Sequence, residues 1–143
     1  MEAIVYRKSK GDDLPQIMDL LKALDLNTSN IIVDGFWVAV EGSRVVGCAR
    51  IIEMEDGNIE LASVAVVEEY RKKGIGSKIM QMLLSQEKRR PVYLMCRRTN
   101  QRFYEEQGFG EAEDNLLPAY YRQKVESKRR ETKIDGLAMI KNR

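Results

Sequence analysis

The chain has 143 residues, of which 43% are hydrophobic, and this is enough for one domain, residues 1–143, with a single sizeable core. Its 24 basic and 22 acidic residues nearly cancel to a net charge of +2, so the overall charge favours neither a nucleic acid nor a membrane surface as a partner. The sequence contains no histidine, which excludes the commonest general base and the commonest zinc ligand, and we expect no metal site.

The first predicted elements are a short strand over residues 3–6 and a helix over residues 14–26. Pro15 falls in the first turn of this helix, where the missing N–H does no harm. Residues 27–30 have the polar composition of a loop.

Three β-rich runs follow and are predicted to form an antiparallel meander. Residues 36–40 and 45–52 are joined by a short turn that contains glycine, which is typical of a hairpin. A second turn at residues 55–58 leads into the third run, which begins at residue 59. We interpret Trp37 in the first run as a core residue.

The third run leads through a charged turn into a helical pattern. Apolar residues recur at i, i+4, i+7 and i+8, namely Ile75, Ile79, Met82 and Leu83. A helix N-terminus has about four unpaired N–H groups and a partial positive charge, and here two glycines and three cations adjoin it. The turn therefore predicts a site for a phosphate or pyrophosphate, although a solvated basic turn is the alternative. Its glycine spacing fits neither a P-loop nor a dinucleotide-binding fold.

The remaining elements are a strand over residues 92–96, a short helix that ends at Gly108, and a final strand over residues 136–140. Because a helix connects the strand at 92–96 to the previous strand, a parallel, right-handed crossover is expected. Residues 122–133 are strongly charged. Acidic residues interleave the cations there and stacking aromatics are lacking, so a solvated helix or loop is favoured over a nucleic-acid site.

Two motifs in this order resemble the GNAT superfamily of acetyl-CoA-dependent N-acetyltransferases. Residues 71–76, RKKGIG, match the family pattern Q/R-x-x-G-x-G/A, which wraps the pyrophosphate of coenzyme A. Residues 103–109, FYEEQGF, match the pattern F-Y-x-x-x-G-F that commonly follows the fifth strand. The resemblance implies an α+β fold of the GNAT type. Its mixed, mostly antiparallel sheet is flanked by helices and has a parallel pair, strands 4 and 5, that splays apart.

The resemblance also implies acetyl-CoA as cosubstrate and places residues around it. The cofactor-binding residues are Val64, Ala65, Val66, Arg71, Lys72, Lys73, Gly74, Ile75, Gly76, Ser77 and Asn100. Val64 and Val66 would bind the pantetheine arm through their main chain, and Asn100 through its side chain.

The same resemblance suggests two catalytic residues. Tyr104 is placed as the acid that protonates the CoA sulfur, because a phenol with a pKa of about 10 is protonated at neutral pH. The alternative for Tyr104 is a packed aromatic. Glu60 aligns with a glutamate that some members use as a base through a water, and the alternatives are a purely structural carboxylate or solvent as the base.

The acceptor is expected to be a primary amine of a small molecule or amino acid, attacked directly in a ternary complex. The tail, residues 117–122 and 135–139, is weakly similar to short amino-acid N-acetyltransferases of the N-acetylglutamate-synthase type. The family binds acceptors partly through the segment that corresponds to residues 25–35. Protein N-terminal or lysine acetylation and a non-catalytic CoA-binding module are the alternatives, and members are often homodimers.

Cysteine usage and hydropathy indicate the compartment. Cys48 and Cys96 lie in apolar, strand-like runs, so we expect buried, reduced thiols. The first ten residues are too charged for a signal peptide, and no run approaches the roughly 20 apolar residues that span a bilayer. These features predict a soluble, cytoplasmic protein with no membrane partner.

Overall fold

The computed structural model describes residues 3–31 and 35–143. Their contacts group into two compact units, one comprising Met1–Ile52 and Leu61–Lys88 and the other Glu53–Glu60 and Arg89–Arg143. Seven strands follow the hydrogen-bonded order β1-β2-β3-β4-β5-β7-β6. The first unit contains β1, β2 and most of β3 and β4, and the second contains the start of β4 together with β5, β7 and β6.

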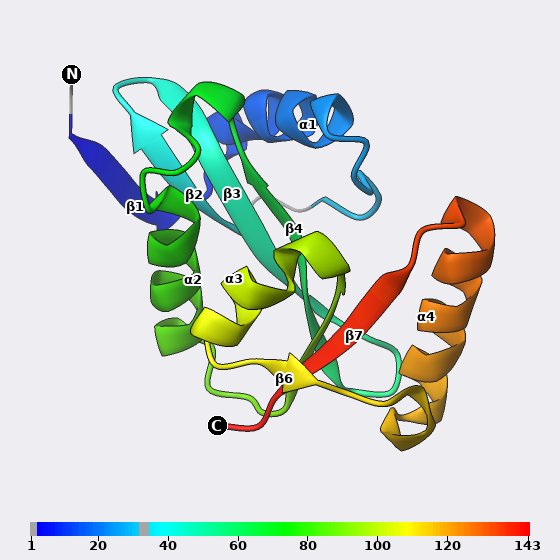
Figure 1. The fold of residues 1–143 in the computed structure, drawn as a ribbon. Helices are drawn as coiled ribbons and strands as arrows, with labels where there is room; N and C mark the ends of the chain where they lie inside the picture. The colour runs from blue at the N-terminus through cyan, green and yellow to red at the C-terminus, as the bar shows by residue number, and fades with distance from the viewer. Residues whose placement is uncertain (1–2, 32–34) are drawn as a thin grey trace. The chain divides into compact units, whose positions relative to one another are not determined.

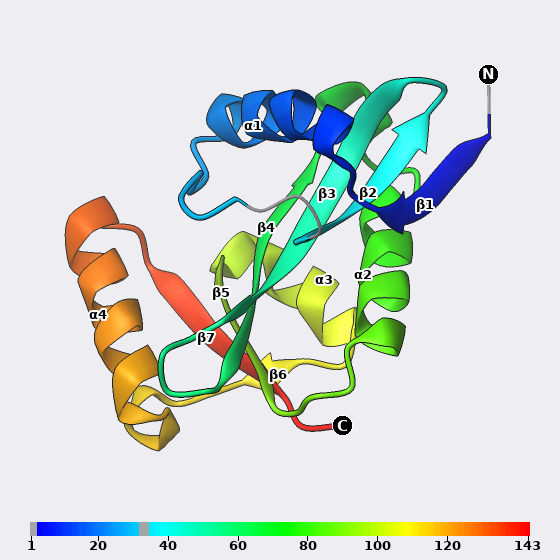
Figure 2. The same cartoon turned by 180° about the vertical axis from the view of Figure 1, so that it is seen from behind.

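The first unit has antiparallel strands and two helices (Figures 1 and 2). Its elements are β1 (Ile4–Lys8), α1 (Leu14–Ala23), β2 (Phe36–Glu41), β3 (Arg44–Glu53), β4 (Ile59–Val66) and α2 (Ile75–Gln86). The β2–β3 hairpin that the sequence predicts is confirmed, with Val38 opposite Cys48. Val38 and Cys48 pack with Leu21 of α1. The residue before Cys48 on β3, Gly47, instead lies against Ile79 of α2. Since successive residues of a strand point to opposite faces, α1 and α2 cover opposite sides of these strands.

Helix α1 begins at Leu14, as predicted, and ends earlier than the prediction. A short 3-10 turn (Gly11–Asp13) precedes it, and the Asp13 carboxylate accepts hydrogen bonds from the Lys10 N–H and the Arg7 Nη1, both at 2.7 Å. The hydrogen bond from Arg7 holds the pKa of Asp13 below its usual value. The helix ends at Ala23 rather than at Leu26, because Asp25 takes a left-handed conformation with φ 56°.

The second unit contains the parallel pair. Strand β5 (Val92–Arg97) pairs with the start of β4 at Ile59–Val92 and Glu60–Tyr93, and it pairs antiparallel with β7 (Gly136–Lys141). The remaining elements of this unit are α3 (Gln101–Glu106), β6 (Gly110–Glu111) and α4 (Ala119–Thr132), with 3-10 turns at Arg98–Asn100 and Asp114–Leu116. A further 3-10 turn, Glu68–Tyr70, belongs to the first unit. The predicted parallel pairing and the mixed sheet are confirmed, and the right-handed sense of the crossover stays a prediction.

The charged segment at residues 122–133, for which the sequence allowed a helix or a loop, forms most of helix α4. The helix begins at Ala119, and Leu117, Tyr121 and Val125 recur at every fourth position and are buried. These residues pack with Met54 and Tyr93 in the core of the second unit. No helix in the described part of the chain is long and apolar enough to cross a bilayer.

Gly47 fixes how closely α2 approaches β3. A Cβ atom at this position would lie 2.9 Å from Ile79 Cδ1 and 3.3 Å from both the Ala65 carbonyl oxygen and Ile75 Cγ2. Only a glycine avoids these contacts without moving the backbone of β4.

We predict that Gly47→Val lowers the free energy of unfolding by about 1–3 kcal/mol, because it overpacks the contact between α2 and β3. Urea unfolding followed by circular dichroism measures this loss. Gly11→Ala is the matched control, since a Cβ there meets nothing within 4 Å. Equal urea midpoints for Gly47→Val and the parent would contradict close packing between α2 and β3.

Candidate active site

The turn between β4 and α2 presents backbone N–H groups at the helix start. Gly74 is the N-cap residue in a left-handed conformation, with φ 79° and ψ 7°, and no side chain caps the helix. The Gly74 carbonyl accepts the hydrogen bond of the Lys78 N–H at 3.0 Å. The N–H groups of Ile75 and Gly76 therefore precede the helical ladder and point toward the helix start, where an anion is stabilised.

Tyr70 anchors this turn to the hairpin of β2 and β3. Its hydroxyl donates to Glu41 Oε1 at 2.6 Å, and this hydrogen bond is the main reason that the pKa of Tyr70 is raised. Arg44 and Lys73 each hold a cation 5.4 Å from the centre of the Tyr70 ring. The hydrogen bond to Glu41 and the cation–π contact of Arg44 thus link the turn to the hairpin, and the Lys73 contact lies within the turn.

Arg71 makes a contact that the sequence does not predict. Its Nε donates to the Val66 carbonyl oxygen at 3.1 Å. We expected this carbonyl to be available to a ligand, and the described structure instead pairs it with the first residue of the RKKGIG motif. The side chains of Arg71, Lys72 and Lys73 are exposed, so the turn remains a cationic surface.

Strand β4 changes conformation just before the predicted main-chain contacts. Ser63 has φ 57°, which is unusual within a strand and rotates the backbone of Val64 relative to the preceding residues. Ala65 is buried against the α1 face, whereas Val64 and Val66 are partly exposed. The splayed opening beside this strand stays a prediction.

In the second unit, Tyr104 lies on α3 with its ring between Phe103 and Phe109. The centre of the Tyr104 ring lies 5.0 Å from that of Phe103 and 6.2 Å from that of Phe109, and both pairs are edge-on. No described residue hydrogen-bonds to the Tyr104 hydroxyl. Burial, and secondarily the neighbouring Cys96, raises the pKa of Tyr104 well above its usual value, so the phenol stays protonated at neutral pH.

Asn100 sits at the N-cap of α3 and is exposed. No side chain makes a capping hydrogen bond at the start of this helix. The Asn100 amide is consequently not used by the helix start.

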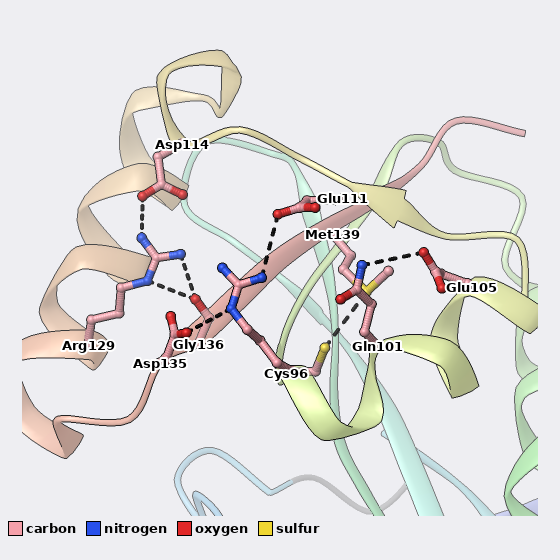
Figure 3. A network of polar contacts seen from close by, with 10 residues as sticks. Cys96, Gln101, Glu105, Glu111, Asp114, Arg129, Asp135, Gly136 and Met139 are labelled. Atoms are coloured by element: carbon pink, nitrogen blue, oxygen red, sulfur yellow. Dashed lines mark hydrogen bonds and ion pairs between the residues drawn. The ribbon is translucent and has the colours of Figure 1, made fainter.

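Cys96 lies at the end of β5, beside Tyr104. Figure 3 shows its sulfur pointing toward Met139 of β7, at an S–S distance of 3.7 Å. Both cysteines are free, Cys48 buried and Cys96 partly exposed. Burial raises the pKa of the Cys96 thiol to about 11, so the group is neutral at neutral pH and a poor nucleophile.

Glu60 is held by two donors from α4. The Tyr121 hydroxyl donates to Oε2 at 2.7 Å and the Lys124 ammonium to Oε1 at 2.5 Å. The Glu60 side chain is 9% exposed and Lys124 37% exposed. Burial, and to a smaller extent the neighbouring Glu60, raises the pKa of Tyr121 well above its usual value. The Tyr121 hydroxyl therefore stays protonated and donates its hydrogen bond to Glu60.

The structure groups the predicted residues by unit. The first unit contains the β4–turn–α2 residues at positions 64–66 and 71–77, and the second contains Glu60, Asn100 and Tyr104. Sequence reasoning missed Tyr70, Tyr121 and Lys124. The spacing of Leu117, Tyr121 and Val125 could have shown that Tyr121 lies on the buried face of a helix. Within residues 3–31 and 35–143 there is no cluster of three or more potential metal ligands.

Comparisons with known proteins agree with this arrangement. Residues 33–111, more than half of the chain, match the family described as acetyltransferase (GNAT) domain. An uncharacterized N-acetyltransferase of Chlorobaculum tepidum, CT2212, is 29% identical over 123 residues, which are 82% of this chain and 78% of that protein.

Two solved structures share the fold. N-acetylglutamate synthase from Neisseria gonorrhoeae, complexed with coenzyme A and N-acetyl-glutamate, has a TM-score of 0.79 at 17% identity and is matched over 99% of this chain. The chain spans only 35% of that protein's length. Rv2747 from Mycobacterium tuberculosis, in complex with CoA and NLQ, has a TM-score of 0.79 at 21% identity, over 97% of this chain and 99% of that one.

We predict that Tyr121→Phe lowers the free energy of unfolding by about 1–3 kcal/mol, because the buried Glu60 carboxylate loses a donor. Tyr120→Phe is the matched control, since Tyr120 is the neighbouring, 37% exposed tyrosine. The raised pKa of Tyr121 also means that its contribution is present below about pH 10, where the unfolded tyrosine ionises, and is lost at higher pH.

Urea unfolding between pH 7 and pH 11 measures both effects. The parent should lose more stability above pH 10 than Tyr121→Phe does. Identical curves for the two proteins would contradict the assigned hydrogen bond.

Proposed function

The chain belongs to the GNAT family of acetyltransferases, and from that premise we propose that it transfers the acetyl group of acetyl-CoA to a primary amine of a small molecule or amino acid. The observation that carries the proposal is the uncapped start of α2, where Gly74 leaves the N–H groups of Ile75 and Gly76 free of the helical ladder. A diphosphate is the ligand that such a site, with three adjacent cations, suits best.

The donor would be held by main chain and by charge. We place its pyrophosphate on residues 72–77, with Arg71 nearby, and its pantetheine amides along Val64, Ala65 and Val66. The Val66 carbonyl accepts a hydrogen bond from Arg71, and the Arg71 side chain would free this carbonyl for the pantetheine by turning toward the anion. Donor binding and release of the Val66 carbonyl would then occur together. Asn100 is assigned to the pantetheine.

The transfer itself needs few groups. The amine nitrogen attacks the thioester carbonyl carbon, a C–N bond forms, and the C–S bond breaks. The departing thiolate takes the proton of the Tyr104 phenol, and the amine loses one proton. Tyr104 suits the acid role because its hydroxyl has no partner among the described residues and its raised pKa keeps it protonated.

The contacts of Glu60 bear on which group accepts the proton of the amine. Its two oxygens accept hydrogen bonds from Tyr121 and Lys124, so a water would have to share one of them to pass its proton to the carboxylate. We therefore propose solvent as the main proton acceptor, with Glu60 orienting the site through its ion pair.

An amino acid is the favoured acceptor class. The support is the fold shared with N-acetylglutamate synthase from Neisseria gonorrhoeae, whose structure contains N-acetyl-glutamate, and the similarity of the chain's tail to such enzymes. Residues 25–31 and 35 belong to the expected acceptor segment, and residues 32–34 lie outside the described part of the chain. Thiol release from acetyl-CoA with a panel of amino acids and amines tests the class directly.

We predict that Gly74→Glu abolishes acetyl-CoA binding, because a side chain at φ 79° strains the turn and adds a negative charge where a diphosphate would bind. Val64→Ile, which keeps a β-forming residue and the same main chain, should bind within a few-fold of the parent. Calorimetric titration with acetyl-CoA measures both. Equal affinities for the two variants would exclude the turn as the donor site.

We predict that Tyr104→Phe lowers kcat by about 10²–10⁴-fold and leaves the KM for acetyl-CoA nearly unchanged, because it removes an acid and no binding surface. Tyr120→Phe is the control and should retain the parent kcat. Because the Tyr104 pKa is raised, its ionisation should produce no fall in rate below about pH 10. An unchanged kcat in Tyr104→Phe would remove this residue from the mechanism.

A further inference from the structure

Arg50 is a buried arginine on β3 whose side chain joins two distant segments of the first unit. It is 3% exposed. Its Nε donates to the Ser63 hydroxyl of β4 at 2.9 Å, and its Nη1 donates to the carbonyl oxygens of Ser29 at 3.0 Å and Asn30 at 3.3 Å. A guanidinium offers its donors in a fixed plane, and the Nε and Nη donors of Arg50 form a fork. This fork fixes β4 and the loop after α1 relative to each other.

Further contacts hold the fork in one orientation. The Arg50 Nη2 donates to the Asn27 carbonyl oxygen at 3.5 Å, and the guanidinium carbon lies 5.2 Å from the centre of the Phe36 ring. Phe36 is fully buried, which leaves the guanidinium little room to rotate. The loop of residues 27–30 is thus attached to the sheet through the backbone carbonyls that Arg50 reaches.

Both ends of the fork contact residues in left-handed backbone conformations. Ser63 has φ 57° and Asn30 has φ 57°, values that cost free energy for a residue other than glycine and persist only where neighbours hold them. Ser63 directly precedes Val64, the first of the main-chain positions assigned to the pantetheine. A shift of β4 at Ser63 would therefore move Arg50 and, with it, the carbonyls of residues 27–30.

We propose that Arg50 is a positioning residue that transmits the state of the donor-binding strand β4 to the loop of residues 27–30. This inference rests on the proposed binding of acetyl-CoA along Val64–Val66. Binding of the thioester fixes β4, Ser63 fixes Arg50, and Arg50 holds the loop in one conformation. The same contacts work in reverse, so a molecule that binds the loop would strengthen binding of the donor.

The test is hydrogen exchange with and without saturating acetyl-CoA, followed on peptides that cover residues 63–67 and 27–31. In the parent, acetyl-CoA should slow exchange several-fold in both peptides. In Arg50→Lys, whose ammonium keeps the charge but cannot form the fork, acetyl-CoA should still slow exchange at 63–67 and should no longer do so at 27–31. A purely structural role would raise exchange in the free protein without removing this response to the ligand.

Two further variants keep the test decisive. Ser63→Ala removes only the Nε contact and leaves the Nη1 and Nη2 contacts in place, so it should perturb the fold less than Arg50→Lys does and lose the same response at 27–31. Arg102→Lys, at a 91% exposed arginine, controls for the chemical change and should behave as the parent.

The outcomes separate the two proposals. If calorimetry shows that acetyl-CoA binds the parent but exchange at 27–31 does not change, or if the change survives in both variants, the role of Arg50 is wrong and donor binding stands. If the parent gives no heat with acetyl-CoA, the donor site is wrong and the role of Arg50 falls with it.

Discussion

The start of helix α2 imposes the constraint on which the rest of the donor site depends. Backbone N–H groups in the first turn of a helix have no carbonyl partner within the helix, and no side chain caps them here. Gly74 makes this possible, because its left-handed conformation turns the chain out of the preceding loop and directly into the helix. Tyr70 and its contacts with Glu41, Arg44 and Lys73 then hold the loop against the hairpin. In the proposed donor complex, the diphosphate would accept hydrogen bonds from these N–H groups.

The two residues proposed for catalysis, Tyr104 and Glu60, lie in different environments. Tyr104 is enclosed by aromatic rings and a neutral thiol, which favour its protonated form. Glu60 is buried beside a lysine and a tyrosine, which supply a positive charge and two hydrogen bonds. The raised pKa of Tyr104 suits the proposed acid role, whereas both oxygens of Glu60 are already occupied by hydrogen bonds.

Much of the fold could be predicted because local signals agreed with one another. The β2–β3 hairpin, the helix after the glycine-rich turn and the parallel pairing of β4 with β5 followed from hydrophobic period, turn residues and the crossover rule. The conformation of the RKKGIG turn could be predicted for the same reason, because a glycine at the helix start is a local signal, and its role as the donor site stays a prediction.

The parts that could not be predicted depend on long-range contacts. Lys124 reads as one cation in a charged segment, and only the packing of α4 brings it to Glu60, 64 positions earlier in the chain. The sequence gives no sign that Ser63, a polar residue within a strand, has a left-handed backbone conformation. The early end of α1 arises from a left-handed Asp25, which apolar spacing does not reveal. Side-chain partners and backbone reversals of this kind require the folded structure.

The most direct test of the central claim is a ¹H–¹⁵N correlation spectrum recorded during titration with coenzyme A. A diphosphate bound at the start of α2 accepts hydrogen bonds from the Ile75 and Gly76 N–H groups. Their amide proton signals should therefore move downfield and saturate together with the rest of the binding site. Saturable binding that leaves these two signals in place, with the largest changes on another element such as α4, would contradict the account.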